Sequence, residues 1–81
     1  MIDIGNYQIN FHGFSWGGEN KYTLIEIVLF DNKDNFMENK WFYIQGKPNL
    51  AVFKHLDEKD IAAMYSKPQY YRFHLQPAIY V

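Results

Sequence analysis

The stretch Tyr22–Phe30, with the sequence YTLIEIVLF, decides the fold of this 81-residue chain. Its side chains alternate between two faces, as they do in a β-strand, and both faces are apolar except at Glu26. One face carries Thr23, Ile25, Ile27 and Leu29, and the other carries Tyr22, Leu24, Val28 and Phe30. A strand that is apolar on both faces is usually central in its sheet or covered on both sides. The pattern therefore predicts a central strand.

The segment before this strand predicts a second one. Residues 6–12 alternate, with Tyr7, Ile9 and Phe11 on one face and polar side chains on the other. This is the pattern of a strand with one buried and one hydrated face. The glycine-rich stretch 12–20 is predicted to be a connection, with a turn at its paired glycines.

Two further strands are expected after the central one. Asp31–Asn35 is typical of a turn, because Asn and Asp hydrogen-bond their own backbone and tolerate positive φ. Residues 40–45, with WFYI at their centre, predict the third strand, which Gly46–Asn49 ends. Residues 70–76 alternate again and predict the last strand, in which Pro77 favours an edge position or a break.

A helix is predicted over residues 57–66. Asp57 is a favourable N-cap residue, and Glu58 and Asp60 place negative charge in the first turn, where the helix dipole favours it. A Lys-Pro pair ends the pattern. The preceding residues 49–56 fit either a helix or a short strand.

The resulting order is β-β-β-α-β. We therefore expect residues 1–81 to form one small α+β domain, with a mostly antiparallel sheet and one helix, near 57–66, packed on one face. Such a small chain needs large side chains to build a core. It contains no cysteine for disulfides, and 20% of its residues are aromatic.

Net charge and hydropathy limit the kinds of partner and the cellular compartment that we expect for the chain. The formal net charge is −1, and Arg72 is the single arginine, so nucleic acid and anionic membrane have little electrostatic attraction for the chain. The N-terminus lacks the basic and apolar regions of a signal peptide. The apolar runs are far shorter than the roughly 20 residues of a membrane helix. We expect a cytoplasmic protein, in the cell that makes it or in a host cell.

No motif for catalysis or metal binding is present. His12, His55 and His74 are scattered along the chain without the spacing of a metal site. Ser15, Ser66 and the single threonine lie outside any nucleophile motif, and no phosphate-binding loop occurs. The sequence therefore predicts no catalytic residues, no metal and no cofactor, which describes a protein that is not an enzyme.

Protein binding is the function that the composition favours. Such a short chain holds more aromatic residues than it can easily enclose, and exposed Tyr and Trp are typical of protein interfaces. The residues expected at the interface are Phe14, Trp16, Tyr70, Arg72 and His74. The rings of Phe14 and Trp16 could instead fold inward and complete the core.

The partner is expected to be a larger protein, which the chain would block as an inhibitor, or as an immunity or counter-defence protein of a bacterium or phage. The chain could also form a homodimer through an edge strand. The alternative function is a single-stranded nucleic-acid-binding domain that stacks bases on aromatic side chains of the sheet.

Overall fold

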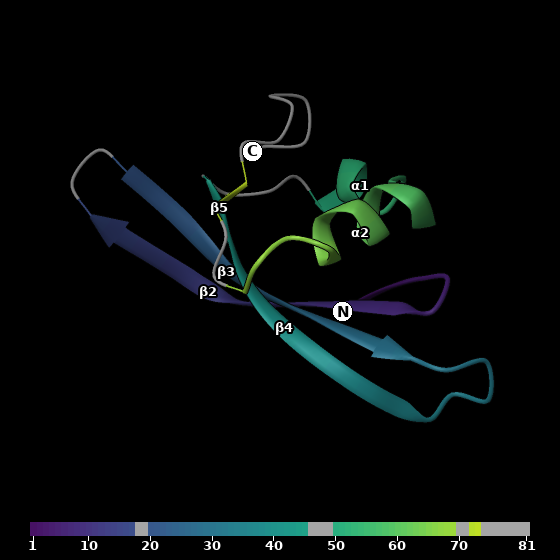
Figure 1. Cartoon of the computed structure of the whole chain (residues 1–81). Helices are drawn as coiled ribbons and strands as arrows, with labels where there is room; N and C mark the ends of the chain where they lie inside the picture. Colours follow the sequence, from purple (N-terminus) through teal and green to yellow (C-terminus); the bar gives the residue numbers. More distant parts are fainter. Residues whose placement is uncertain (18–19, 46–49, 70–71, 74–81) are drawn as a thin grey trace.

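The computed structural model describes residues 1–17, 20–45, 50–69 and 72–73, and for 13–17, 20, 21, 45, 52, 72 and 73 it describes the backbone alone. In chain order the elements are β1 (Ile2–Ile4), β2 (Tyr7–Gly17), β3 (Asn20–Phe30), β4 (Phe36–Gln45), α1 (Leu50–Phe53), α2 (Glu58–Tyr65) and β5 (Arg72–Phe73). The strands form one sheet in the order β1-β2-β3-β4-β5 (Figure 1). The α+β class expected from the sequence is confirmed.

Strands β1 to β4 form an antiparallel meander with β3 at its centre, as the pattern of Tyr22–Phe30 predicts. Strand β5 pairs with β4 in the parallel direction, at Tyr43 and Ile44. A parallel neighbour needs a crossover connection, and the segment that contains α1 and α2 provides it. Both helices lie on the same face of the sheet (Figure 1).

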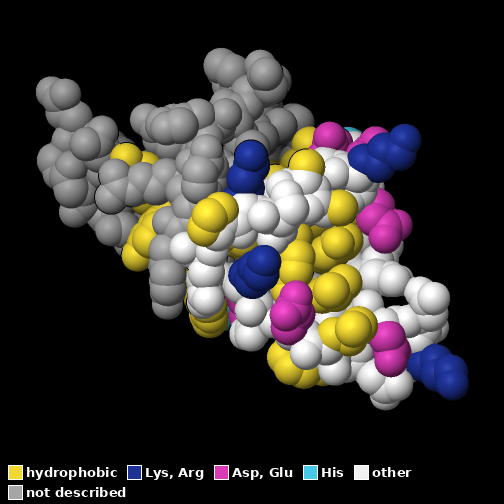
Figure 2. All heavy atoms as spheres, in the orientation of Figure 1, with side chains coloured by type: hydrophobic (Ala, Val, Ile, Leu, Met, Phe, Trp, Pro, Cys, Tyr) yellow, Lys and Arg dark blue, Asp and Glu magenta, His cyan; other side chains and the backbone are white. Residues whose placement is uncertain are grey.

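The core lies between this inner face and the two helices. Its fully buried side chains come from alternate positions of the strands and from one side of each helix, and they are Ile9, Thr23, Ile25, Ile27, Phe42, Ile44, Phe53 and Ile61. Edge-to-face contact of Phe11 with Phe53, at 5.4 Å between ring centroids, joins β2 to α1. Tyr7 and Tyr65, 5.5 Å apart, join β2 to α2. Figure 2 shows further hydrophobic side chains at the surface between α2 and the β3–β4 turn.

The two turns at the far end of the sheet are tied together. Gly5, in the β1–β2 turn, has φ +57°, a left-handed conformation that favours glycine. The carboxylate of Asp31 accepts hydrogen bonds from the backbone N–H groups of Lys33 and Asn35, which fixes the β3–β4 turn. Asn6 donates from Nδ2 to Asn32 Oδ1 at 2.9 Å, and so joins one turn to the other.

Helix α2 begins with a reciprocal cap. Asp57 Oδ1 accepts from the backbone N–H of Asp60 at 2.9 Å, and Asp60 Oδ2 accepts from the backbone N–H of Asp57 at 3.2 Å. At the other end, Lys40 Nζ donates to the carbonyl of Tyr65 at 3.1 Å, where a cation also complements the helix dipole. The boundaries expected for this helix are confirmed, with Asp57 and Ser66 as its caps.

Replacing Asp57 with Ala is expected to lower the free energy of unfolding by about 1 kcal/mol, because the first-turn N–H groups lose their acceptor. A shift of the urea midpoint measures this change. Asp57→Asn is the matched control and should stay close to the wild type, since asparagine caps helices about equally well. Equal midpoints for the alanine variant and the wild type would contradict the capping assignment.

Three expectations about local structure need correction. Residues 12–17 are not part of an open connection, because strand β2 continues through Gly17, which pairs with Asn20 of β3. The turn expected at the paired glycines includes residues 18–19, which lie outside the described residues. A β-bulge between Phe11 and Phe14 accommodates the glycine at 13 inside the strand. Strand β1 was not predicted, and β4 begins at Phe36 instead of residue 40.

The remaining expectations concern the chain after β4. The stretch 49–56, which fitted helix or strand, contains the single helical turn α1. Of the last predicted strand, 70–76, the structure describes Arg72 and Phe73, and the rest lies outside the described residues. Among the helices that are described, none is long and apolar enough to cross a membrane.

Candidate functional site

The face of the sheet opposite the helices is the candidate functional surface, and we call it the open face. Strand register places alternate residues of β2, β3 and β4 on it, and these are Gln8, Asn10, His12, Tyr22, Leu24, Glu26, Val28, Asn39, Trp41 and Tyr43. No described helix or strand covers it (Figure 1). Val28, on this face of the central strand, is only 7% exposed.

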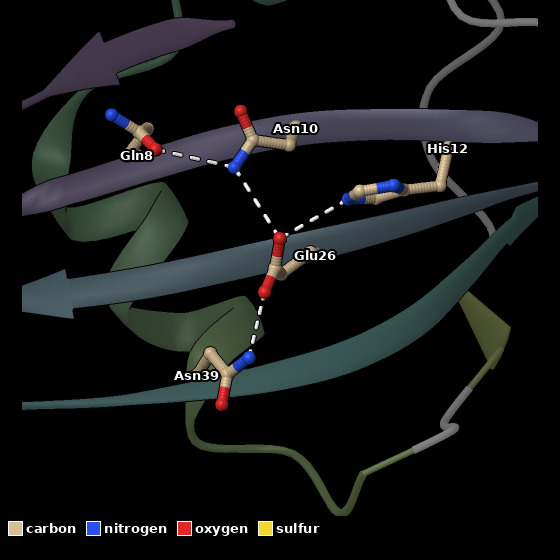
Figure 3. A network of polar contacts seen from close by, with 5 residues as sticks. All are labelled: Gln8, Asn10, His12, Glu26 and Asn39. Carbon is tan, nitrogen blue, oxygen red and sulfur yellow. Dashed lines mark hydrogen bonds and ion pairs between the residues drawn. The ribbon is translucent and has the colours of Figure 1, made fainter.

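A polar half of the open face is centred on Glu26, in the middle of β3 (Figure 3). Asn39 on β4 donates to Glu26 Oε2 at 2.6 Å, and Asn10 on β2 donates to Oε1 at 3.4 Å. His12 Nε2 lies 3.1 Å from the same Oε1. Asn10 also donates to Gln8, on the same strand, at 3.2 Å. Together these contacts join β2, β3 and β4.

This network fixes the charge of Glu26. The hydrogen bond from Asn39 has the largest effect, and with those from His12 and Asn10 it lowers the pKa of the Glu26 carboxyl below its usual value. Partial burial acts in the opposite direction and is outweighed. The carboxylate is therefore ionised at neutral pH, and it is the fixed negative charge of the open face.

An aromatic half adjoins this polar half, beside Leu24. Tyr22 on β3 and Tyr43 on β4 meet edge to face, with ring centroids 6.2 Å apart and planes at 76°. Trp41 lies opposite Glu26 in the β3–β4 register, and its ring centroid is 4.6 Å from that of His12. Each of these two open-face aromatic side chains of β4, Trp41 and Tyr43, is thus in contact with a ring from another strand.

The position of His12 depends on the β-bulge. Between Phe11 and Phe14 the register of β2 shifts, so that His12 and the following glycine share one partner position on β3. Bulges change the direction of a side chain relative to a regular strand. At this bulge the imidazole reaches both the Glu26 carboxylate and the Trp41 ring, and it therefore links the polar half to the aromatic half.

Titratable groups elsewhere have structural roles. The Tyr65 hydroxyl is buried and makes no hydrogen bond, although the Glu38 carboxylate lies near enough to affect it. Burial, and secondly Glu38, raise the pKa of the Tyr65 phenol, so it stays protonated. Over the described part of the chain, no three His, Asp or Glu side chains gather as metal ligands would.

One hollow, of about 330 Å³, lies between the β1–β2 turn and the β3–β4 turn. Asp3 and Asp34 contribute carboxylates to its lining, beside Asn6, Tyr7 and Phe30. Both carboxylates are exposed to solvent, and Asp3 accepts a hydrogen bond from Gln8. A catalytic pair works in a site shielded from water, and this hollow does not provide one.

The residues expected at the interface are spread over the sheet. The backbones of Phe14 and Trp16 belong to β2, opposite Thr23 and Lys21 of β3, and their side chains lie outside the description. Arg72 is in β5, which β3 and β4 separate from β2, and its side chain is likewise not described. Tyr70 and His74 lie outside the described residues.

Sequence reasoning did not assign a role to Glu26, Asn39, Trp41 or Tyr43. The signal was nevertheless present, because Glu26 is the single charged residue in the largely apolar stretch Tyr22–Phe30. A charge at that position is tolerated only if hydrogen-bond donors surround it, and neighbouring strands supply these donors here.

No protein-family model, curated protein or solved structure matches the chain.

Proposed function

We propose that the chain is a non-catalytic binding module and that the aromatic half of its open face contacts a protein partner. The observation that carries the proposal is the aromatic pair Trp41 and Tyr43, held by His12 and Tyr22 on a sheet face without a described cover. Tyr and Trp are enriched among the residues that dominate protein interfaces. Side chains held before binding lose less conformational entropy when the partner arrives.

The chemistry of the partner follows from Glu26. Three donors occupy its carboxylate, which has about four acceptor sites in total. Its side chain keeps 16% of its surface exposed, beside the aromatic half. We therefore propose a partner surface that is apolar, with a Lys or Arg side chain at the margin that approaches Glu26.

The aromatic half also favours a second candidate function, the stacking of single-stranded bases. Proteins of that kind combine aromatic side chains with a positively charged groove. The described side chains of the open face include Glu26 and no lysine or arginine, so the phosphate backbone would meet a negative charge. Protein binding is the better supported of the two.

The biological role that we propose is inhibition of a larger protein in the cytoplasm, as in immunity or counter-defence proteins of bacteria and phages. A flat face on a small rigid sheet can obstruct a partner's surface without any chemistry of its own.

Trp41→Ala is expected to abolish capture of the partner from host lysate, because an aromatic anchor of this kind contributes about 2 kcal/mol or more. The measurement is affinity capture with quantitative mass spectrometry, followed by titration of the protein that the wild type captures. Leu50→Ala is the matched control, since Leu50 is an exposed apolar residue on α1, away from the open face.

Two results would overturn this proposal. If Leu50→Ala loses the partner and Trp41→Ala keeps it, the interface is on the helical side. If the wild type binds oligonucleotides tightly at physiological salt and Trp41→Ala does not, the open face binds nucleic acid instead.

A further inference from the structure

The outer edge of β2 has a stretch that pairs with none of the described strands. Strand β1 pairs with β2 only from Tyr7 to Ile9, whereas β2 continues to Gly17. Past Ile9, no other described strand lies on that side of β2. In the segment 10–17, every second residue therefore points its backbone N–H and C=O groups away from β3. These groups can form hydrogen bonds with another strand.

This stretch lacks the residues that usually prevent edge pairing. Natural edge strands carry charged side chains or proline, or are very short. Residues 10–17, with the sequence NFHGFSWG, contain no Lys, Arg, Asp, Glu or Pro. The bulge at Phe11–Phe14 is the one protective feature, and it twists the strand without adding charge.

The other edges of the same sheet provide a comparison. Strand β1 has only three residues, and the central one is Asp3. Over the described residues, strand β5 pairs with β4 at Tyr43 and Ile44, and the part of β4 before that carries Glu38 and Lys40. A short strand and charged side chains thus discourage pairing at these two edges. The β2 stretch is longer and contains no Lys, Arg, Asp or Glu.

We propose that residues 10–17 of β2 pair with the same residues of a second copy of this chain, antiparallel about a twofold axis perpendicular to the sheet. Identical uncharged segments then face each other without like-charge repulsion, and the net charge of −1 opposes association only weakly. Both strands carry the same bulge and the same right-handed twist, so their edges match.

This arrangement joins the two sheets into one continuous sheet. A twofold axis perpendicular to the sheet keeps equivalent faces on the same side. The open faces of the two copies therefore form one extended surface, with the four helices on the other side. Asn10 and His12 belong both to this stretch and to the open face, but the two proposals use different groups. Pairing uses the backbone N–H and C=O groups of β2, whereas the proposed function uses the rings of Trp41 and Tyr43 on β4.

The first test is the solution mass of the full chain, measured by light scattering over a wide range of concentrations. We expect twice the monomer mass at high concentration, falling to the monomer mass on dilution. A monomer at every concentration up to the solubility limit would refute the proposal, and a trimer or larger assembly would refute the twofold arrangement.

The second test places a charge on each of two edges. Ser15→Lys, in the β2 stretch, is expected to raise the dimer dissociation constant by roughly tenfold or more, since a lysine on an edge strand discourages pairing with another strand. Met37→Lys adds the same charge to the uncovered part of β4 and is expected to leave the dissociation constant unchanged. The opposite result, a weaker dimer with Met37→Lys alone, would place the interface on β4.

A third measurement avoids substitution and holds even if Ser15→Lys fails to fold. Amide hydrogen exchange of the wild type is followed at high and at low concentration. We expect residues 10–17 to be protected more strongly at high concentration, while β3 shows no change. Equal exchange of residues 10–17 at both concentrations would contradict the proposed interface.

Discussion

Phe42→Ala is expected to lower the free energy of unfolding by about 3–5 kcal/mol, the usual range for a phenylalanine removed from a core. Phe42 is fully buried in β4, opposite Ile25 of the central strand. The inner face offers little that could fill the space, because its neighbours are already packed on all sides. A domain stability of about 5–15 kcal/mol would lose a large part to this one change.

Phe36→Ala is the matched control for this prediction. It makes the same chemical change in the same strand, but Phe36 is 61% exposed near the β3–β4 turn. We expect its effect to stay within about 0.5 kcal/mol. Urea denaturation followed by circular dichroism compares the two variants, and similar losses for both would show that the assigned inner face of β4 is wrong.

Phe53→Ala is also expected to lower the free energy of unfolding by about 3–5 kcal/mol. We expect it to destabilise a different part of the molecule from Phe42→Ala. Phe53 is fully buried, and its ring meets Phe11 of β2 edge to face. Helix α1 is a single turn, too short to be stable without this contact. The loss should therefore be concentrated where the helices pack on the sheet.

Hydrogen exchange measures this difference. In Phe53→Ala we expect the amides of α1 and α2 to exchange faster, while the central strands keep most of their protection. Leu50→Ala, in the same helical turn but 49% exposed, should leave the exchange pattern unchanged. Equal loss of protection in the helices and in β3 would mean that the domain opens only as a whole.

The core could be predicted from the sequence because successive side chains of a strand point to opposite faces, so apolar residues at every second position mark the buried face. Ile9, Ile25 and Ile27 were expected on one face of their strands, and all three are fully buried. Helix α2 was likewise predictable, since the cap at Asp57 depends on residues only three positions apart. Both features are local, so the sequence pattern contains them.

The missing features depend on contacts between distant segments. Strand β1 has three residues, too few to show alternation, and its pairing with Tyr7–Ile9 is what makes it a strand. The glycines after His12 indicated a connection, but a bulge within a long hairpin accommodates Gly13 equally well. Composition alone does not distinguish these cases.

The open-face network was beyond prediction for the same reason. Glu26, Asn39 and His12 come from three strands, and their contacts require the registers of two strand pairs at once. The sequence showed an isolated charge in an apolar strand, and the structure shows the donors that stabilise it. The interface residues predicted from aromatic content therefore do not include Trp41 or Tyr43.

The parallel pairing of β5 also has a consequence for the order in which the chain folds. Strand β3 begins three residues after the end of β2, and β4 begins six residues after the end of β3, so their pairing closes small loops and requires little loss of chain entropy. Pairing of β5 with β4 closes a much longer loop that contains both helices. Contacts of that kind form slowly. We therefore expect the meander to assemble first and the pairing of Arg72 and Phe73 with β4 to form last.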